Sequence, residues 1–165
     1  MTHSSIKEQL PSSHPHPASG QNLRDWQLAL RVFAAPADTN LDGDIFGGWL
    51  LAQADIAAVS IAAARAQGRV ATVAINAFQF QAPIRIGDLV DLYARIDRTG
   101  KTSITIDVSA WARRASKPEA IREVATGKLV FVALDDDGRA RPLPVLPESC
   151  AEMESQQRHL SLSRN

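Results

Sequence analysis

The stretch that decides the fold runs from Gly48 to Gln67 and reads GWLLAQADIAAVSIAAARAQ. Alanine and leucine dominate it and no proline interrupts it, so it predicts one long α-helix. Its polar side chains are few (Gln53, Asp55, Ser60 and Arg65), and a helix that is apolar almost all round must be buried on most of its sides. A membrane span is the alternative because the length nearly suffices, but Gln53, Asp55 and Arg65 argue against it.

Strands are expected on both sides of this helix. Before it, Trp26–Phe33 alternates, with Trp26, Leu28, Leu30 and Val32 on one side. After it, four further strands are expected at Val70–Phe80, Leu89–Asp97, Thr102–Arg113 and Ile121–Leu134, with Pro118 breaking the pattern before the last. Successive strands joined by short turns should pair antiparallel. We therefore expect an α+β fold in which a five-stranded antiparallel sheet wraps around one central helix, with its open edge covered by a second copy.

The composition limits the chemistry. The chain has 165 residues and a formal net charge of zero, which suits a single soluble domain and argues against a nucleic-acid partner. No histidine lies between His16 and His159, and Cys150 is the single cysteine. Histidine catalysis, Cys–His dyads, His/Cys zinc sites and disulfides are thus not expected in the core. A carboxylate remains for acid–base work.

The ends of the chain differ from its middle. Residues 1–22 are rich in Ser, Pro and His and lack apolar periodicity, so we expect a disordered arm without a secretory signal. Residues 23–146 form the expected domain, and residues 147–165 a polar tail. The protein is expected in the cytoplasm and away from membranes.

The candidate site is the segment from Asp38 to Trp49, DTNLDGDIFGGW. Asp44 precedes a helix whose first residues include Gly47 and Gly48, and glycine lets a substrate approach the backbone closely. Free N–H groups at a helix start favour an oxygen that gains negative charge, and an adjacent carboxylate can activate water or attack directly. The alternative from the residues alone is that Asp44 simply caps the helix.

A calcium loop is a second interpretation of the same segment. Asp38, Asn40, Asp42 and Gly43 follow EF-hand spacing, but the twelfth position is Trp49 instead of glutamate. The segment before it also predicts a strand instead of a helix, so no metal site is expected.

Residues Asp38–Gln53 with Asp55 resemble the signature of hotdog-fold acyl-CoA thioesterases, in particular the bacterial YciA-like branch. The similarity continues through 68–73 (GRVATV), 83–88 (PIRIGD), 99–103 (TGKTS) and Trp111, and covers roughly residues 25–144. The sequence departs from this pattern at Ala82, where a basic residue is expected, and at Ala74, where a larger or charged one is common.

The resemblance implies roles for individual residues. Asp44 matches the catalytic carboxylate, and Gly47 and Gly48 match the helix start that polarises the thioester carbonyl. The expected substrate contacts are Asn40, Phe46, Arg69, Val70, Thr72, Gly100, Lys101, Thr102 and Ser103. It also implies that the site is built between two subunits of a dimer, or of a dimer-based tetramer or hexamer, and that the partner subunit contributes the coenzyme A contacts.

The expected activity is hydrolysis of acyl-CoA thioesters, with the coenzyme A thioester as substrate and no cofactor. A non-catalytic acyl-CoA binding module on the same fold is the alternative; a hotdog dehydratase is disfavoured because the body lacks histidine. Among weaker candidates, Asp55 is expected to be structural, and Asn76 and Gln79 to point to opposite faces of their strand. Arg113, Arg114 and Lys117 form a basic cluster that could hold a phosphate.

Overall fold

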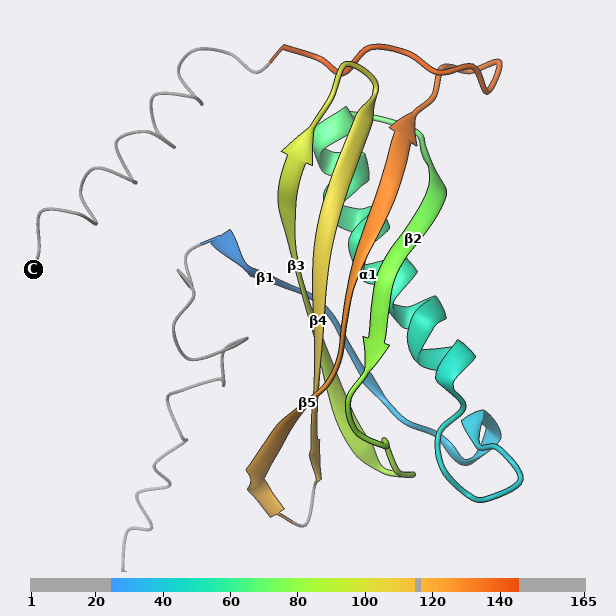
Figure 1. Ribbon diagram of the computed structural model, residues 1–165, viewed down its shortest axis with the longest axis vertical. Helices are drawn as coiled ribbons and strands as arrows, with labels where there is room; N and C mark the ends of the chain where they lie inside the picture. The colour runs from blue at the N-terminus through green and yellow to red at the C-terminus, as the bar shows by residue number, and fades with distance from the viewer. Residues whose placement is uncertain (1–24, 115–116, 146–165) are drawn as a thin grey trace, which may run out of the picture.

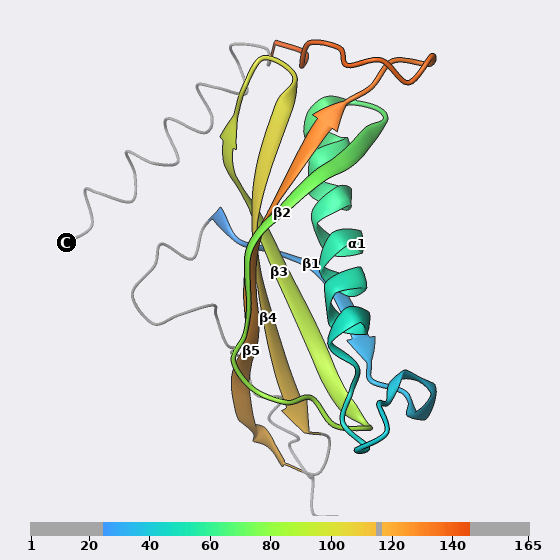
Figure 2. The same ribbon diagram turned by 45° about the vertical axis from the view of Figure 1, so that its right-hand side comes forward.

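A computed structural model describes residues 25–114 and 117–145. The elements are β1 (Gln27–Phe33), the short 3₁₀ helix η2 (Pro36–Asp38), α1 (Gly47–Ala66), β2 (Val70–Phe80), β3 (Asp88–Thr99), β4 (Ser103–Arg114) and β5 (Lys117–Ala133). The strands form an antiparallel sheet in the order β1-β3-β4-β5-β2, which curls around α1 (Figures 1 and 2). The predicted α+β architecture is confirmed. The predicted arm 1–22 and tail 147–165 lie outside the described residues.

The helix packs on the sheet through small side chains. Its buried residues are Leu50, Ala54, Ala57, Ala58, Ala62 and Ala66, which recur at the three- and four-residue spacing of one helix face. By length and composition alone α1 could cross a membrane, but the core helix of a soluble protein passes the same test, and this face of α1 lies in the core.

The helix ends lie close to the predicted positions. It starts at Gly47, one residue early, and stops at Ala66 because Gln67 adopts a left-handed conformation (φ 50°). The guanidinium of Arg141 donates to the carbonyl oxygen of Ala66 at 2.7 Å, where a cation is favoured by the helix dipole.

The strand order differs from simple succession. β2 and β3 are consecutive in the chain but do not pair, because residues 81–87 carry the chain past β5 and β4; β2 pairs with β5 instead. β1 and β2 therefore form the two edges of the sheet. The antiparallel pairing predicted for β3 with β4 and for β4 with β5 is confirmed.

Irregularities account for three errors at the level of single residues. A bulge between Leu28 and Leu30 leaves Leu28 exposed, and Ala29 packs on the core instead. β5 begins at Lys117, before the predicted start at Ile121. Its first residues pair only with β4, and Pro118, which has no N–H, is tolerated at such an unpaired edge.

The third error concerns β2, where the register shifts between Asn76 and Gln79 and Ala77 has a positive φ of 51°. Asn76 pairs with Lys128 and Gln79 with Thr126, two residues apart on β5, so Asn76 and Gln79 share a face. The prediction of opposite faces was wrong because a bulge adds one residue to the alternation.

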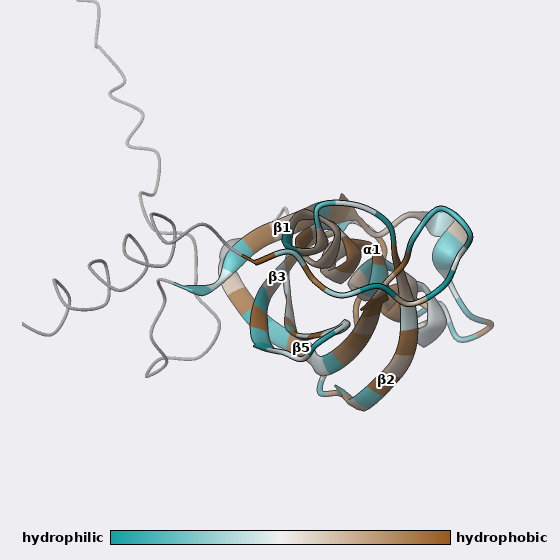
Figure 3. Cartoon of the chain, turned by 90° about the horizontal axis from the view of Figure 1, so that it is seen from above, coloured by the Kyte–Doolittle hydropathy of each residue, from teal (hydrophilic) through white to brown (hydrophobic). Residues whose placement is uncertain are grey.

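Viewed from above, the strands alternate between hydrophobic and hydrophilic residues (Figure 3). On β4 the positions that face α1 are Ile104, Ile106, Val108, Ala110 and Ala112. The opposite face carries polar side chains, several of them buried: Asp91, Tyr93, Thr105 and Ser109. The core thus lies between the helix and one face of the sheet, and the two ends of α1 are separated by about 30 Å.

Candidate active site

The loop between η2 and α1 holds Asp44 at the start of the helix. The backbone of Asp44 forms an isolated antiparallel bridge with Arg85, and that of Thr39 forms one with Ile45. The side-chain oxygen of Asn40 accepts hydrogen bonds from the backbone N–H groups of Asp42 and Asp44, both at 3.0 Å. The loop conformation is therefore fixed by its own asparagine.

The carboxylate of Asp44 is half-buried and is not used by the fold. Across residues 25–114 and 117–145 it forms no hydrogen bond and no ion pair. The N-cap of α1 is Phe46, which has an extended backbone and no side-chain cap bond. The alternative that Asp44 caps the helix is therefore wrong, and its carboxylate is available for chemistry.

The first two N–H groups of α1 are also available. Phe46 donates its N–H to the carbonyl oxygen of Asp38 at 2.8 Å, and Trp49 donates to Phe46 at 3.0 Å. Within the described ranges, the N–H groups of Gly47 and Gly48 between them have no acceptor. They lie at the positive end of a 20-residue helix, which suits a developing oxyanion.

Both glycines lie close to an aromatic ring. A Cβ on Gly48 would lie 2.5 Å from the Phe46 ring, and one on Gly47 would lie 3.4 Å from the ring of Phe80. Phe46 is 58% exposed, and Phe80 is 57% exposed. Glycine at these two positions leaves room for rings beside the free N–H groups.

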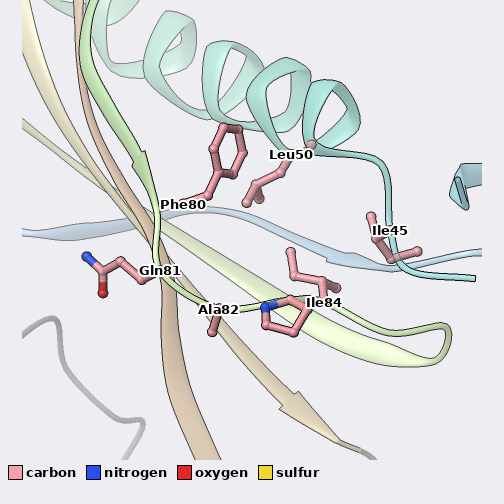
Figure 4. A pocket seen from close by; sticks show the side chains of 8 residues that line it. Ile45, Leu50, Phe80, Gln81, Ala82 and Ile84 are labelled. Carbon is pink, nitrogen blue, oxygen red and sulfur yellow. The ribbon is translucent and has the colours of Figure 1, made fainter. Parts of the chain in front are cut away.

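A pocket of about 370 Å³ opens beside the helix start (Figure 4). Its large apolar side chains are Ile45, Leu50, Phe80 and Ile84. Gly47 lines it from the helix, and Gln81, Ala82 and Pro83 complete it from the segment that follows β2. The sequence analysis did not identify this pocket, because its wall comes from the end of β2, more than 30 residues after Gly47.

The predicted coenzyme contacts lie at the other end of α1. Arg69 and Val70 follow the helix C-terminus, whereas Asp44 precedes its N-terminus. The turn between β3 and β4 is at that same end, because Thr102 accepts a hydrogen bond from Ala133, which pairs with Val70. One chain thus brings Asp44, Asn40, Phe46, Gly47 and Gly48 together and holds the other predicted residues about a helix length away.

Some of these distant side chains already have partners. Arg69 donates to the carbonyl oxygens of Asp135 and Asp136 at 3.5 and 3.2 Å. The hydroxyl of Thr72 donates to Asp55 at 2.7 Å, which ties β2 to α1 and supports the structural role expected for Asp55. Lys101 is exposed, at the tip of a turn closed by the Gly100 N–H donating to the Ser103 carbonyl at 2.8 Å.

The basic cluster predicted near the end of β4 is largely neutralised. Arg113 pairs with the buried Asp91, and Arg114 pairs with the buried Asp88 at 3.2 Å. The side chain of Lys117 lies outside the described part of the chain. Arg85 is a further basic residue near the candidate site, and its backbone forms a bridge with that of Asp44. Nothing in the sequence indicated this contact, although Arg85 belongs to the motif 83–88, because it depends on the pairing of two distant loops.

The calcium interpretation is not supported by the loop geometry. The Asn40 side-chain oxygen points to backbone N–H groups, and Asp38 accepts from the backbone N–H of Ala35 at 3.1 Å. Residues 25–114 and 117–145 hold no group of three or more His, Cys, Asp or Glu that could bind a metal.

The chain is similar in sequence to known thioesterases. The Thioesterase superfamily model matches residues 42–118. The acyl-CoA thioester hydrolase YciA of Salmonella typhimurium is 47% identical over 126 residues, which are 75% of this chain and 95% of that protein. The acyl-CoA thioester hydrolase YciA of Escherichia coli is 44% identical over 126 residues, which are 75% of this chain and 96% of that protein.

Solved structures agree. The hexameric thioesterase y2039 from Yersinia pestis superposes with a TM-score of 0.70 at 42% identity, covering 72% of this chain and 97% of that one. Cj0915, a hexameric hotdog fold thioesterase of Campylobacter jejuni, gives a TM-score of 0.67 at 31% identity, with 76% and 93% covered. The predicted hotdog fold is confirmed.

Proposed function

The chain belongs to the YciA acyl-CoA thioester hydrolases of the thioesterase superfamily, and from this premise we propose that it hydrolyses acyl-CoA thioesters with Asp44 as its catalytic carboxylate. The observation that carries the proposal is local. A carboxylate without a partner in the described chain lies three residues before two free N–H groups at a helix start. The alternative of a non-catalytic binding module is disfavoured because the relatives are named hydrolases.

The proposed reaction divides the work between these groups. Asp44 takes a proton from a water molecule while the oxygen of that water attacks the thioester carbonyl carbon. The Gly47 and Gly48 N–H groups bind the oxygen that becomes negative in the tetrahedral intermediate. When the intermediate collapses, the carbon–sulfur bond breaks, and the leaving coenzyme A thiolate takes the proton that Asp44 holds, which restores the carboxylate. The products are a free acid and coenzyme A, and the step requires no cofactor.

A covalent route uses the same residues. Asp44 could attack the carbonyl carbon itself and form a mixed anhydride, which water then hydrolyses. A single turnover in ¹⁸O water tests the covalent route. Label in the Asp44 carboxylate establishes an anhydride that water opens at the aspartyl carbon, whereas label in the product acid alone arises from the general base or from an anhydride that water opens at the acyl carbon.

The proposed site is completed by a second copy of the chain. β2 is an edge strand with exposed apolar side chains, Val73 at 57% and Phe80 at 57%. Two copies that pair antiparallel along β2 place the start of one strand beside the end of the other. The partner's segment from Arg69 to Thr72 and its turn from Gly100 to Ser103 then approach Asp44.

This arrangement gives the coenzyme contacts a physical basis. Lys101 is an exposed cation beside the hydroxyls of Thr102 and Ser103, and such a turn can hold a phosphate or the pantetheine arm. The structurally similar thioesterases of Yersinia pestis and Campylobacter jejuni are described as hexameric, which supports a dimer-based hexamer for this chain. A cytoplasmic location agrees with the single cysteine.

The proposal is tested by Asp44→Ala with Asp42→Ala as the matched control, since both carboxylates belong to one loop and only Asp42 is fully exposed. We expect Asp44→Ala to bind coenzyme A but lose hydrolysis by about 10²–10⁴-fold, and Asp42→Ala to retain it. Equal activity in both variants would remove Asp44 from the reaction.

A mixing experiment tests the shared site. We expect Asp44→Ala and Lys101→Glu each to lower the activity when the oligomer contains only one of the two variants. When the two variants are unfolded and reassembled together, mixed dimers contain one site with both native residues, so we expect part of the activity to return. No recovery in verified mixed dimers would show that one subunit supplies both groups.

A further inference from the structure

The pocket beside Gly47 is lined mainly by apolar residues. Four of its eight lining residues carry large apolar side chains, Ile45, Leu50, Phe80 and Ile84, and Gln81 is the polar residue among them. Figure 4 shows the four apolar side chains around the space between the helix start and the segment after β2, and the side chain of Gln81 directed away from it, where its amide donates to the Thr126 hydroxyl at 3.4 Å. Among the residues that the structure describes, no charged side chain lines the pocket.

Two arginines close to the pocket in the fold, Arg122 and Arg85, do not line it. The guanidinium of Arg122 donates to the Pro83 carbonyl oxygen, and Arg85 faces Asp44 through its backbone bridge without lining the pocket. An anionic group in this space would lose water without gaining a partner, which costs heavily. A hydrocarbon chain would lose little and would gain apolar contacts.

The position of the pocket relates it to the reacting carbonyl. Gly47, whose N–H lacks an acceptor in the described chain, is itself a lining residue, and Ile45 follows Asp44 directly. A thioester carbonyl held by the Gly47 N–H therefore lies at the mouth of this space, where one of its two substituents can enter. The volume of 370 Å³ equals that of about a dozen liquid waters, and a methylene group fills nearly as much space as a water, so the pocket has room for a chain of roughly eight to twelve carbons.

Phe80 is the lining residue best placed to limit the chain. Its ring lies 3.4 Å from the Cβ position of Gly47 and packs edge-on against Phe78, with ring centroids 5.1 Å apart. Phe78 is held in turn, because a Cβ on Gly127 would fall 2.3 Å from its ring. The ring of Phe80 is thus supported on one side and borders the pocket on the other.

We propose that this pocket binds the acyl chain, that it selects uncharged chains of medium length over carboxylated ones, and that Phe80 limits the length accepted. The proposal rests on the function proposed above, because it assigns a substrate class to the same site. It requires no residue from the partner subunit, although a partner that pairs along β2 would border the exposed side of Phe80.

The first test measures thiol release from acetyl-, butyryl-, octanoyl-, lauroyl- and succinyl-CoA. We expect KM to fall by up to about fourfold for each added methylene and then to level off between about eight and twelve carbons, and we expect succinyl-CoA to be used at least tenfold less efficiently than butyryl-CoA. A KM independent of chain length, or equal use of succinyl-CoA and butyryl-CoA, would overturn the proposal. Absence of release from every substrate would instead overturn the proposed function.

Variants test the pocket wall itself. Phe80→Ala should raise the ratio of lauroyl to butyryl turnover, whereas Ala82→Leu, which fills the space, should lower the ratio of octanoyl to acetyl turnover. Phe33→Ala is the control, because Phe33 is 62% exposed and is not a lining residue. Each variant is first checked for native assembly by light scattering. Unchanged ratios in both assembled variants would place the acyl chain elsewhere.

A charge swap gives an independent readout. Gln81→Lys adds a cation at an exposed lining position, and Gln79→Lys adds the same charge on β2 outside the pocket. We expect Gln81→Lys alone to raise the ratio of succinyl-CoA to butyryl-CoA efficiency. An equal effect of both substitutions would assign the change to the general field of the protein and would count against the pocket.

Discussion

Asn40 and Asp44 hold one another through two hydrogen bonds across the loop that begins the active site. The side-chain oxygen of Asn40 accepts the Asp44 N–H at 3.0 Å, and the Asn40 N–H donates to the Asp44 carbonyl oxygen at 2.8 Å. The sequence analysis expected Asn40 to contact substrate, but its side-chain oxygen is occupied by the backbone. The main structural effect of Asn40 is to fix the position of Asp44, the proposed catalytic carboxylate.

We therefore predict that Asn40→Ala lowers kcat by roughly 10–100-fold, because a small displacement of a catalytic group is costly. Asn40→Asp is the control, since it retains an oxygen that accepts the same two N–H groups. Steady-state kinetics on a fully assembled protein provides the measurement. If both substitutions reduce kcat equally, the amide nitrogen of Asn40 acts on substrate, and the positioning role is wrong.

Substitutions at Gly47 can separate the effect of its N–H group from the effect of the space that glycine leaves. Phe46 has φ −62° and ψ 127°, a conformation that a following proline accepts, and proline is tolerated at the first helical position. Gly47→Pro therefore removes one N–H while leaving the helix intact. We predict a loss of about 10²–10³-fold in kcat, as for the removal of one oxyanion donor.

Gly47→Ala is the matched control, because its Cβ meets the Phe80 ring at an ordinary distance of 3.4 Å and its N–H remains. We expect it to retain most of the activity. If alanine costs as much as proline, the space at Gly47 matters more than its hydrogen bond, and the oxyanion assignment fails.

The parts of the site that the sequence predicted are those that lie close together in the chain. Asp44, Gly47 and Gly48 lie within five consecutive positions, so the start of the helix alone determines their relation. Phe80 and Arg85 reach this region only through tertiary pairing, which an alternating pattern does not encode. The left-handed Ala77 also adds a residue to β2, and no alternation rule foresees such a bulge.

The predicted coenzyme contacts were not brought to Asp44 within one chain, because they lie far from it in the fold. Arg69 and Lys101 matched the expected coenzyme contacts, yet both lie at the far end of α1 from Asp44. In the proposed shared site a twofold partner brings its own Arg69 and Lys101 to Asp44, and the sequence of one chain does not encode which residues meet across two copies. The coarse fold was predictable because one apolar helix and five strands allow few ways of burying the helix.

The buried ion pair network on the outer face of the sheet should dominate its electrostatic stability. Asp91 is 1% exposed and pairs with both Arg31 and Arg113. The hydrogen bond that Arg31 donates to Asp91 raises the pKa of the Arg31 guanidinium. Asp91→Ala leaves two cations without their partner. We predict a loss of about 3 kcal/mol in the free energy of unfolding, at the low end for buried pairs because Arg31 is partly exposed.

Asp137→Ala provides the comparison by urea denaturation, because its pair with Arg139 is exposed on both sides. Its expected cost is below about 0.5 kcal/mol. Similar losses in the two variants would mean that burial of Asp91 adds nothing to the pair.

Tyr93 should make the protein sensitive to alkali. Its side chain is 6% exposed, and its hydroxyl is buried without a hydrogen-bond partner in the described residues. Burial raises the pKa of this phenol above its ordinary value of 10.0, and the nearby Asp91 raises it further. The unfolded chain then releases the proton first, so the stabilising contribution is complete below pH 10 and is lost as the pH rises through the folded pKa.

Tyr93→Phe removes this alkaline loss. At neutral pH we expect the variant to unfold within about 1 kcal/mol of the wild type, because the hydroxyl gives up no hydrogen bond; the difference should then shift in favour of the variant above pH 10. Tyr93 is the single tyrosine of the chain, so tyrosinate absorbance reports its titration directly. A folded protein whose tyrosine titrates at the ordinary value of 10.0 would show that the phenol reaches water and that its burial does not govern alkaline stability.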